Sequence, residues 1–130
     1  MKTPHWLDPR ALVLLHAEVL AEHGGLTGLR DQAAFESAMA RPPNVYHYER
    51  GADIPRLAAA YAYGIIQNHS FNDGNKPLGF LAAVLFLELN RFELKCDQAD
   101  AIQTFFSVAA GNLSEQNLTV WIRNNAIRRG

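Results

Sequence analysis

The spacing of apolar and polar residues predicts helices over most of the chain. The first helix follows Asp8 and Pro9, ends at Gly24-Gly25, and carries along one face Leu12, Leu15, Val19 and Leu20. An aspartate side chain accepts hydrogen bonds from the free N–H groups of a first turn, proline fits that turn, and glycine fits the end of a helix. The start and stop signals therefore agree with the helical period.

Two further helices are predicted before the middle of the chain. Asp31 caps the second, which we expect to end at Pro42-Pro43 because proline has no N–H and disfavours helical geometry in the residue before it. The third spans Ile54–Asn68, with one stripe formed by Leu57, Tyr61, Gly64, Ile65 and Asn68. The glycine in that stripe indicates the close approach of another helix, which we expect to be the apolar helix that follows.

Residues 78–90 form this fourth predicted helix, which is apolar at every position from Phe80 through Leu87. A helix that is hydrophobic all round is buried, so we expect its N-terminus near the centre of the molecule. After it, a short extended segment is predicted from the alternation of Phe92, Leu94 and Cys96 with polar residues. Asp97 then caps a fifth helix to about residue 110, and Ser114 caps a sixth. The prediction is an all-α fold in a single domain, residues 1–130, with about six helices around a central buried one.

Composition narrows the function classes. The chain has 130 residues, 48% hydrophobic residues and a net charge of −1, which gives no electrostatic reason to bind nucleic acid. The C-terminal arginines complement a helix dipole instead (Arg123, Arg128 and Arg129). No apolar run reaches the about 20 residues that span a bilayer, and the stretch 1–5 lacks a secretion signal. The lone Cys96 excludes an internal disulfide and fits a small buried hydrophobe, so we expect a cytoplasmic protein.

Candidate chemistry is concentrated in residues 69–76, His-Ser-Phe-Asn-Asp-Gly-Asn-Lys, between the third and fourth helices. An imidazole accepts a hydroxyl proton near neutral pH, which makes His69 a candidate general base. Asp73 offers the hard carboxylate oxygen that suits Mg²⁺ on the phosphates of a nucleotide. Gly74 permits an unusual backbone conformation. An ordinary helix–loop–helix turn, in which residues 73–74 simply make the bend, is the alternative.

The end of this stretch has the outline of a phosphate-binding turn. Asn75 and Lys76 supply polar and cationic donors just before a buried helix, whose N-terminal N–H groups favour an anion. Phe71, flanked by polar residues, is expected to insert into the core and anchor the loop. Elsewhere, His16 and His23 share a face of the first helix, but nothing completes a metal-ligand set. We therefore expect His16 to be a core histidine.

The stretch 69–76 resembles the motif His-x-Phe-x-Asp-Gly/Ala-Asn-Lys-Arg of the Fic/Doc family, without a gap. Residues 24–31, 57–64 and 109–114 extend the resemblance over nearly the whole chain. Within the family, the chain is more similar to the death-on-curing toxins of type II toxin–antitoxin pairs. These share the lysine at position 76, where AMP-transferring relatives carry glycine.

The resemblance implies a role for each residue of the motif. His69 would be the catalytic base, Asp73 the Mg²⁺ ligand, and the nucleotide phosphates would be held by Gly74, Asn75 and Lys76. Death-on-curing toxins transfer the γ-phosphate of ATP to a threonine of elongation factor Tu, which arrests translation. ATP, Mg²⁺ and elongation factor Tu are thus implied, together with a cognate antitoxin, Phd-like or similar, that lays a helix in a groove near the active site.

The chain departs from the family pattern at Pro77 and Leu78, where relatives place Arg and usually Thr. Proline fits the first turn of a helix but offers no donor to a phosphate, and it biases Lys76 away from helical geometry. Losing one preorganised donor costs about 2–4 kcal/mol in the transition state. That loss corresponds to about a hundredfold or more in rate, so we expect an attenuated or inactive enzyme.

The stretch 43–51 reads as an irregular segment ahead of the third helix. In Fic-fold proteins this segment forms a flap that docks the target chain by edge pairing, and here Val45, Tyr46 and Tyr48 could supply the edge. A plain surface loop with partly packed tyrosines is the alternative.

Three function classes follow from these observations. The first is a kinase-like toxin that acts on a translation factor. The second is a catalytically silent module that still captures an antitoxin. The third is an AMP-transferase, which Lys76 and Phe80 disfavour because relatives of that class carry Gly and Arg at these positions.

Overall fold

The computed structural model describes residues 3–130, so Met1 and Lys2 of the N-terminal stretch lie outside the described residues. Within this range there are six helices and two short strands: α1 Pro9–His23, α2 Gln32–Tyr48, α3 Ile54–Asn68, α4 Asn75–Leu89, β1 Phe92–Leu94, α5 Gln98–Ala109, α6 Glu115–Asn125 and β2 Ala126–Arg128. The predicted all-α fold is confirmed. None of the helices in this range has both the length and the apolar composition needed to cross a membrane.

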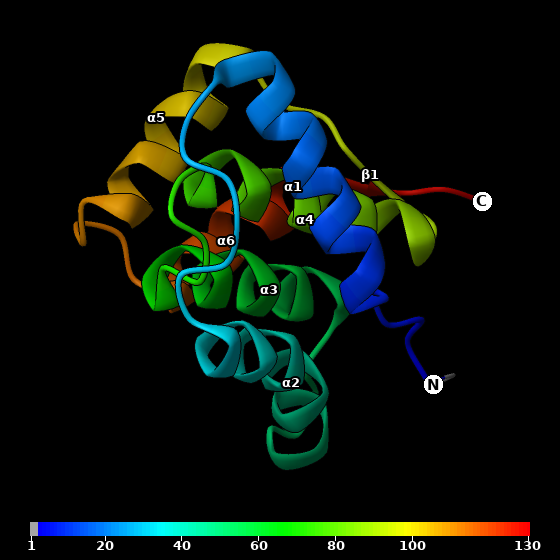
Figure 1. The fold of residues 1–130 in the computed structure, drawn as a ribbon. Coiled ribbons are helices and arrows are strands. Elements are labelled where there is room, and N and C mark those ends of the chain that lie inside the picture. Colours follow the sequence, from blue (N-terminus) through cyan, green and yellow to red (C-terminus); the bar gives the residue numbers. More distant parts are fainter. Residues whose placement is uncertain (1–2) are drawn as a thin grey trace.

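Helix α3 is the central buried helix. It packs against α2 on one side and against α4 and α6 on the others (Figure 1). Its residues from Leu57 to Ala62 are at most 1% exposed, and four of the six are alanines, which allow close packing on every side. The expectation that the following apolar helix is buried all round is wrong on the outer face of α4, where Leu85 is 37% and Leu89 45% exposed.

Glycines set the distance between α3 and its two largest neighbours. A Cβ atom at Gly64 would lie 3.5 Å from the Cα atom of Ala38, so the predicted close approach is confirmed but the neighbour is α2 rather than α4. The approach of α4 is at Gly79, where a Cβ would lie 2.7 Å from the Cγ1 atom of Ile66 and 3.1 Å from the backbone oxygen of Ala62.

Capping residues explain where most helices begin. The side chains of Asp8, Asp31 and Ser114 accept hydrogen bonds from the first turns of α1, α2 and α6, as predicted. Asp97 precedes α5, but its side chain accepts no capping hydrogen bond. Helix α4 starts at Asn75, earlier than the expected residue 78, because Gly74 serves as its N-cap.

The predicted end of α2 at Pro42-Pro43 is wrong, because the helix continues to Tyr48. The ring of Pro42 is less than 2% exposed, and Val45 and Tyr46 pack against the hydrophobic core. This burial offsets the two backbone hydrogen bonds that consecutive prolines cannot donate. Tertiary packing thus overrides a local helix-stop signal.

The same helix removes the predicted flap. Val45, Tyr46 and Tyr48 lie on the last turns of α2, where their backbone groups belong to the helix and form no extended edge. The alternative of a surface loop with partly packed tyrosines is wrong for the same reason, because the segment is helical. Tyr46 is nevertheless partly packed, as that alternative predicted. Tyr48 points outward and is 89% exposed.

The predicted extended segment is confirmed as β1. It pairs antiparallel with β2, with Phe92 opposite Arg128 and Leu94 opposite Ala126. The sequence did not predict β2, because three residues, Ala-Ile-Arg, are too short to show alternation.

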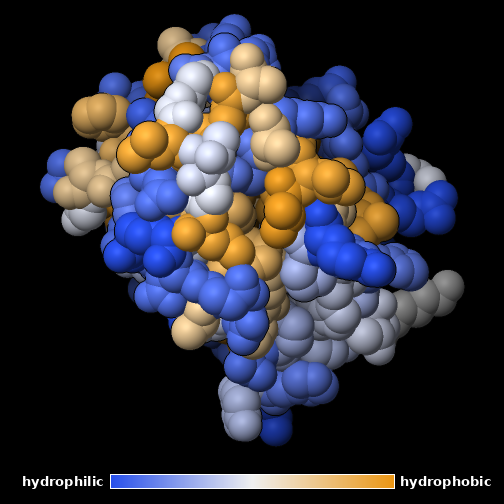
Figure 2. Space-filling view, viewed as in Figure 1, coloured by the Kyte–Doolittle hydropathy of each residue, from blue (hydrophilic) through white to orange (hydrophobic). Residues whose placement is uncertain are grey.

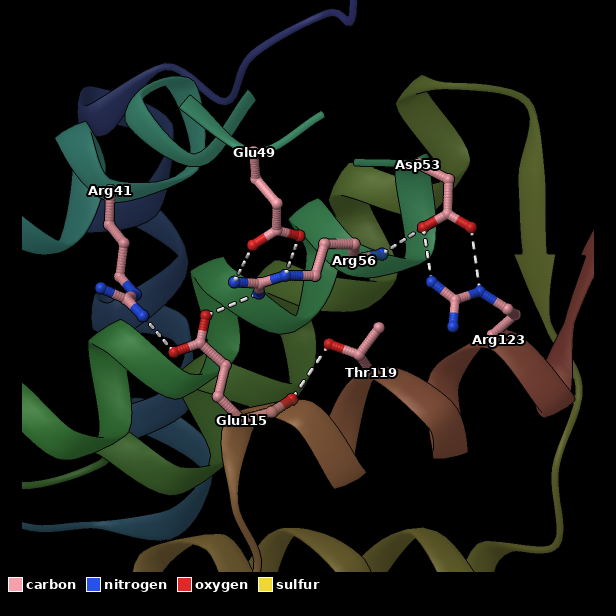
Figure 3. Close-up of polar contacts among 7 residues, drawn as sticks. All are labelled: Arg41, Glu49, Asp53, Arg56, Glu115, Thr119 and Arg123. Atoms are coloured by element: carbon pink, nitrogen blue, oxygen red, sulfur yellow. Dashed lines mark hydrogen bonds and ion pairs between the residues drawn. The ribbon is translucent and has the colours of Figure 1, made fainter. Parts of the chain in front are cut away.

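Ion pairs hold the end of α2 against the starts of α3 and α6 (Figure 3). Arg56 donates to Glu49 at 2.8 Å and to Glu115 at 2.6 Å, and Glu115 also accepts from Arg41. Burial disfavours the charge on Arg56, but the hydrogen bonds to Glu49 and Glu115 outweigh it and raise the pKa of the guanidinium. Asp53, the N-cap of α3, forms a similar pair with Arg123 at 2.9 Å.

Candidate functional site

The motif loop, residues 69–74, connects α3 to α4 and begins with His69 in a left-handed conformation (φ 49°, ψ 52°). This conformation costs a residue with a side chain roughly 1–2 kcal/mol. Arg30 holds it in place, since its Nε donates to the backbone oxygen of His69 at 2.8 Å and its Nη2 to that of Asn68 at 3.3 Å. The imidazole of His69 is exposed, as a proton acceptor for an external hydroxyl must be.

The segment 24–31 lies along the motif loop as a second strand of backbone. Leu29 and Phe71 form an antiparallel bridge, and the N–H groups of Arg30 and Asp31 both donate to the backbone oxygen of Ser70, at 2.8 and 3.1 Å. The segment 24–31 and the motif loop therefore form one structural unit.

Phe71 anchors the loop, as predicted. Its side chain is 1% exposed, stacks on the ring of His16 at a centroid distance of 3.8 Å, and meets Phe35 edge-on at 5.4 Å. His16 is 4% exposed, and its Nε2 bonds with the backbone oxygen of Asp73 at 2.8 Å, which confirms the predicted core histidine.

Asn75 is 6% exposed and its side chain faces the loop rather than solvent. The Oδ1 atom accepts from the N–H of Phe71 at 3.1 Å, and Nδ2 donates to the backbone oxygen of Phe71 at 2.9 Å. The same Nδ2 lies 3.4 Å from Nδ1 of His69, so it contacts the candidate base. A phosphate contact from Asn75 is then left to its backbone N–H, at the N-terminus of α4.

A cleft of about 870 Å³ opens at the other end of the loop. Asp73, Gly74 and Lys76 line it from the motif, and the remaining wall is formed by His23, Gly24, Gly25, Pro77, Phe80, Val84, Leu94, Cys96, Gln98, Ala101, Ile102 and Phe105. Apolar surface gathers on this face of the molecule, in the region of α1 and α5 (Figure 2). His69 and Asn75 are not part of the lining, so the structure brings together only three of the five motif residues with chemical roles.

Cys96 is one of the lining residues and is only half-buried, so the expectation of a small buried hydrophobe is wrong. Burial raises the pKa of its thiol, and the neighbouring carboxylates of Asp100 and Asp97 raise it further. The thiol is therefore held in its protonated, weakly nucleophilic form.

Asp73 is held from two sides. Its Oδ2 atom accepts from the N–H of Leu26 at 2.7 Å, and its backbone oxygen meets His16. Residues 3–130 contain no group of three or more His, Cys, Asp or Glu side chains that could hold a metal by themselves. One carboxylate fits Mg²⁺ when phosphate oxygens and waters complete the shell, which is the usual mode of this ion at nucleotide sites.

Lys76 lies in the first turn of α4, so the expectation that Pro77 displaces it from helical geometry is wrong. The N–H of Leu78 makes the bond to Gly74 at 3.0 Å, and no N–H is needed at position 77 in a first turn. The ammonium group of Lys76 lies 5.1 Å from the centre of the Phe106 ring on α5. Pro77 forms part of the cleft wall without offering a donor.

A second hollow of about 570 Å³ lies beside the end of α2. Val45 and Tyr48 line it together with Asn68, the residue before His69. Two of the three predicted flap residues thus share a hollow with the residue before the candidate base, from a helix instead of an extended edge.

The loop between α3 and α4 is thus anchored by Phe71 and carries an exposed histidine at one end. At its other end, an aspartate, a glycine N-cap and a lysine face a cleft. A family model described as Fic/DOC matches residues 6–87, well over half of the chain, and the chain belongs to this family. Protein kinase doc of Escherichia phage P1 is 27% identical over 117 residues, 90% of this chain and 92% of the relative. Toxin Doc of Mycolicibacterium smegmatis is 37% identical over 78 residues, 57% of this chain and 58% of the relative.

Three contributors to the site were not singled out from the sequence: Arg30, the backbone N–H of Leu26, and Phe106. Arg30 and Leu26 fall in the segment 24–31, whose resemblance to relatives was the available signal. Phe106 gave no signal, because an aromatic residue on a predicted helix reads as core.

Proposed function

We propose that this chain is the toxin of a toxin–antitoxin pair and transfers the γ-phosphate of ATP to a threonine hydroxyl of elongation factor Tu. The observation that carries the proposal is the motif loop, with an exposed His69 at one end and Asp73, Gly74 and Lys76 facing a cleft at the other. The names of the two relatives, a protein kinase and a toxin, support the same class.

The geometry suggests how the residues share the reaction. The nucleotide phosphates lie at the N-terminus of α4, where free backbone N–H groups and Lys76 offer donors. Mg²⁺, when bound by Asp73 and the phosphates, neutralises their charge. His69 takes the proton of the acceptor hydroxyl, whose oxygen forms a bond to the γ-phosphorus. The bond from this phosphorus to the oxygen bridging the β- and γ-phosphates breaks, and ADP leaves.

We further propose that Pro77 attenuates this activity. The residue occupies the cleft wall next to Lys76 and supplies no guanidinium where the family has arginine. Lys76 is then the only Lys or Arg among the residues that line the cleft, and its ammonium group rests on Phe106. The missing donor is worth about 2–4 kcal/mol in the transition state.

A catalytically silent antitoxin-binding module is the second candidate function. The cleft wall formed by Phe80, Phe105 and Ile102 is apolar, and an amphipathic helix of an antitoxin, Phd-like or similar, buries its own apolar stripe in such a groove. This candidate requires the fold and the cleft but not His69. Both candidates act in the cytoplasm, where elongation factor Tu and an antitoxin are present.

AMP transfer is disfavoured. Phe80 packs edge-on against Phe105 at 5.1 Å and leaves an aromatic wall where AMP-transferring relatives carry a second arginine. Lys76 replaces the glycine of those relatives.

Transfer of label from ATP to purified elongation factor Tu with Mg²⁺ tests the proposal. ATP labelled at the γ or the α position is compared for the unchanged chain, Pro77→Arg, Pro77→Arg with His69→Ala, and Pro77→Ala. We expect γ-label transfer that rises about a hundredfold with Pro77→Arg and disappears when His69 is removed. Pro77→Ala is the matched control, because it removes the ring and restores the same backbone N–H as Pro77→Arg without the guanidinium, so its rate should stay low.

Other results of the labelling experiment would favour a different function. Transfer of α-label would replace the kinase by an AMP-transferase. If no variant transfers either label while the chain still binds an antitoxin peptide, the silent module becomes the better account. Equal rates for the unchanged chain and Pro77→Arg would contradict attenuation but keep the kinase.

A further inference from the structure

We propose that His16, on α1, is a positioning residue that fixes Asp73 for metal binding. This inference rests on the proposed function, because it assigns Mg²⁺ to Asp73. His16 itself does not face the cleft, so it would act through the backbone of the residue that does.

The first contact is a hydrogen bond. Nε2 of His16 lies 2.8 Å from the backbone oxygen of Asp73, and the imidazole is 4% exposed. A carbonyl oxygen only accepts, so Nε2 must carry the proton and donate it. The bond joins residues 57 positions apart and fixes the backbone immediately before the N-cap of α4.

The second contact is a stack. The ring of His16 lies on that of Phe71 at a centroid distance of 3.8 Å and an interplanar angle of 24°. Phe71 is itself held by Phe35, so the imidazole cannot tilt without disturbing the loop anchor. His16 therefore touches the motif loop at two points, one on either side of Asn72.

The surroundings leave little room for another arrangement. A Cβ atom at Gly74 would lie 3.5 Å from Nε2 of His16, and one at Gly25 would lie 2.9 Å from the Cβ atom of Asp73. The N–H of Leu26 fixes the carboxylate through Oδ2 at 2.7 Å. Helix α1 thus holds the backbone of Asp73, and the segment after α1 holds its side chain.

A single protein carboxylate makes metal affinity sensitive to its placement. Residues 3–130 contain no group of three or more His, Cys, Asp or Glu side chains that would hold the ion without Asp73. Removing a group that orients a metal ligand typically lowers the affinity for the metal about ten- to a hundredfold.

Two substitutions separate positioning from simple packing. His16→Phe keeps an aromatic ring against Phe71 and removes the donor, whereas His16→Gln keeps an N–H donor at a similar reach and removes the stack. Asp73→Asn is the reference variant for loss of the ligand itself. Mn²⁺ serves as the probe, with a non-hydrolysable ATP analogue, and its affinity is measured by electron paramagnetic resonance.

We expect His16→Phe to weaken Mn²⁺ binding about tenfold or more, and His16→Gln to retain most of the affinity. In the metal-free chain, the amide of Leu26 should exchange its hydrogen faster in His16→Phe than in His16→Gln, because its acceptor on Asp73 is less well fixed. Thermal unfolding of each variant shows whether the fold is kept.

Unchanged Mn²⁺ affinity in His16→Phe would overturn the inference, and so would equal losses in both His16 variants, which would make the residue a packing element. If Asp73→Asn leaves Mn²⁺ binding unchanged, the metal assignment in the proposed function fails. The positioning inference then falls with it, whereas a loss confined to His16→Phe leaves the proposed function standing.

Discussion

Replacing Gly79 by alanine should destabilise the protein, although alanine is the better helix former. The new Cβ would lie 2.7 and 2.8 Å from the Cγ1 and Cδ1 atoms of Ile66 and 3.1 Å from the backbone oxygen of Ala62. Such contacts force α4 away from α3, and overpacking of this kind costs about 1–3 kcal/mol. The higher helix propensity of alanine returns at most about 1 kcal/mol. Subtracting the full propensity gain of about 1 kcal/mol from the overpacking cost leaves a net loss of about 0–2 kcal/mol.

Gly64→Ala is the matched control, because it makes the same change in a buried helical glycine of α3. There the new Cβ would lie 3.5 Å from both the Cα atom of Ala38 and the Cδ atom of Arg41, which is ordinary van der Waals contact. Only the propensity gain remains, so Gly64→Ala should raise the free energy of unfolding by up to about 1 kcal/mol.

Urea unfolding of both variants, followed by circular dichroism, measures the difference. The two variants should share one slope and differ in midpoint, with Gly64→Ala the more stable. A Gly79→Ala protein at least as stable as Gly64→Ala would refute the packing distance between α3 and α4. Because these helices carry the two ends of the motif loop, a real displacement should also lower phosphotransfer in the Pro77→Arg background.

Three further predictions follow from contacts near the site and at the helix ends. Arg30→Met removes the clamp behind His69 and should slow phosphotransfer about ten- to a hundredfold in initial-rate assays, whereas an unchanged rate would show that the clamp does not position the base. Burial raises the pKa of Asp53, but the hydrogen bond from Arg123 helps to lower it below the ordinary 3.8. The carboxylate therefore stabilises the fold above about pH 3.8, and this stabilisation is lost in acid as the carboxyl is protonated. In unfolding titrations, Asp53→Asn should lower the free energy of unfolding by about 0.5–1 kcal/mol near neutral pH and by nothing in acid. A loss of stability that is independent of pH would contradict this. Ser70 is fully buried and, among residues 3–130, its Oγ has no hydrogen-bond partner, so Ser70→Ala should keep or raise the melting temperature, and a clear fall would reveal a hidden partner.

The helix boundaries that the sequence predicted well are those set by local chemistry. Ile54–Asn68 was predicted with its bounds from an apolar stripe that runs to the motif, and the structure shows a local start signal there as well, the Asp53 cap with Pro55 in the first turn. The end of α2 was not predictable in this way. Its continuation through Pro42 accompanies burial of the proline ring in the folded molecule, which no local propensity contains.

In the candidate site too, the sequence predicted local features but not the contacts between distant residues. The order of residues in 69–76 identified the loop and the anchor Phe71, whereas the helix after it was expected from residue 78 and begins at Asn75. The contacts of Arg30 with His69 and of His16 with Asp73 join positions 39 and 57 residues apart, and nothing in the sequence pairs them. The direction of the Asn75 side chain was also hidden, because the free backbone groups of Phe71 attract it.

The two prolines inside α2 have a consequence for how the native protein opens. Without an N–H at positions 42 and 43, the carbonyl groups of Ala38 and Met39 lose their usual helical partners, so the hydrogen-bond ladder is interrupted at two successive steps. Beyond this gap, the packing of Val45 and Tyr46 against the core and the Glu49–Arg56 pair help to hold the turns up to Tyr48 in place. We expect the amides of residues 44–48 to exchange with solvent through a local opening of lower free energy than that of residues 32–41. The helix that Figure 1 labels as the single element α2 would then behave in solution as two cooperative units.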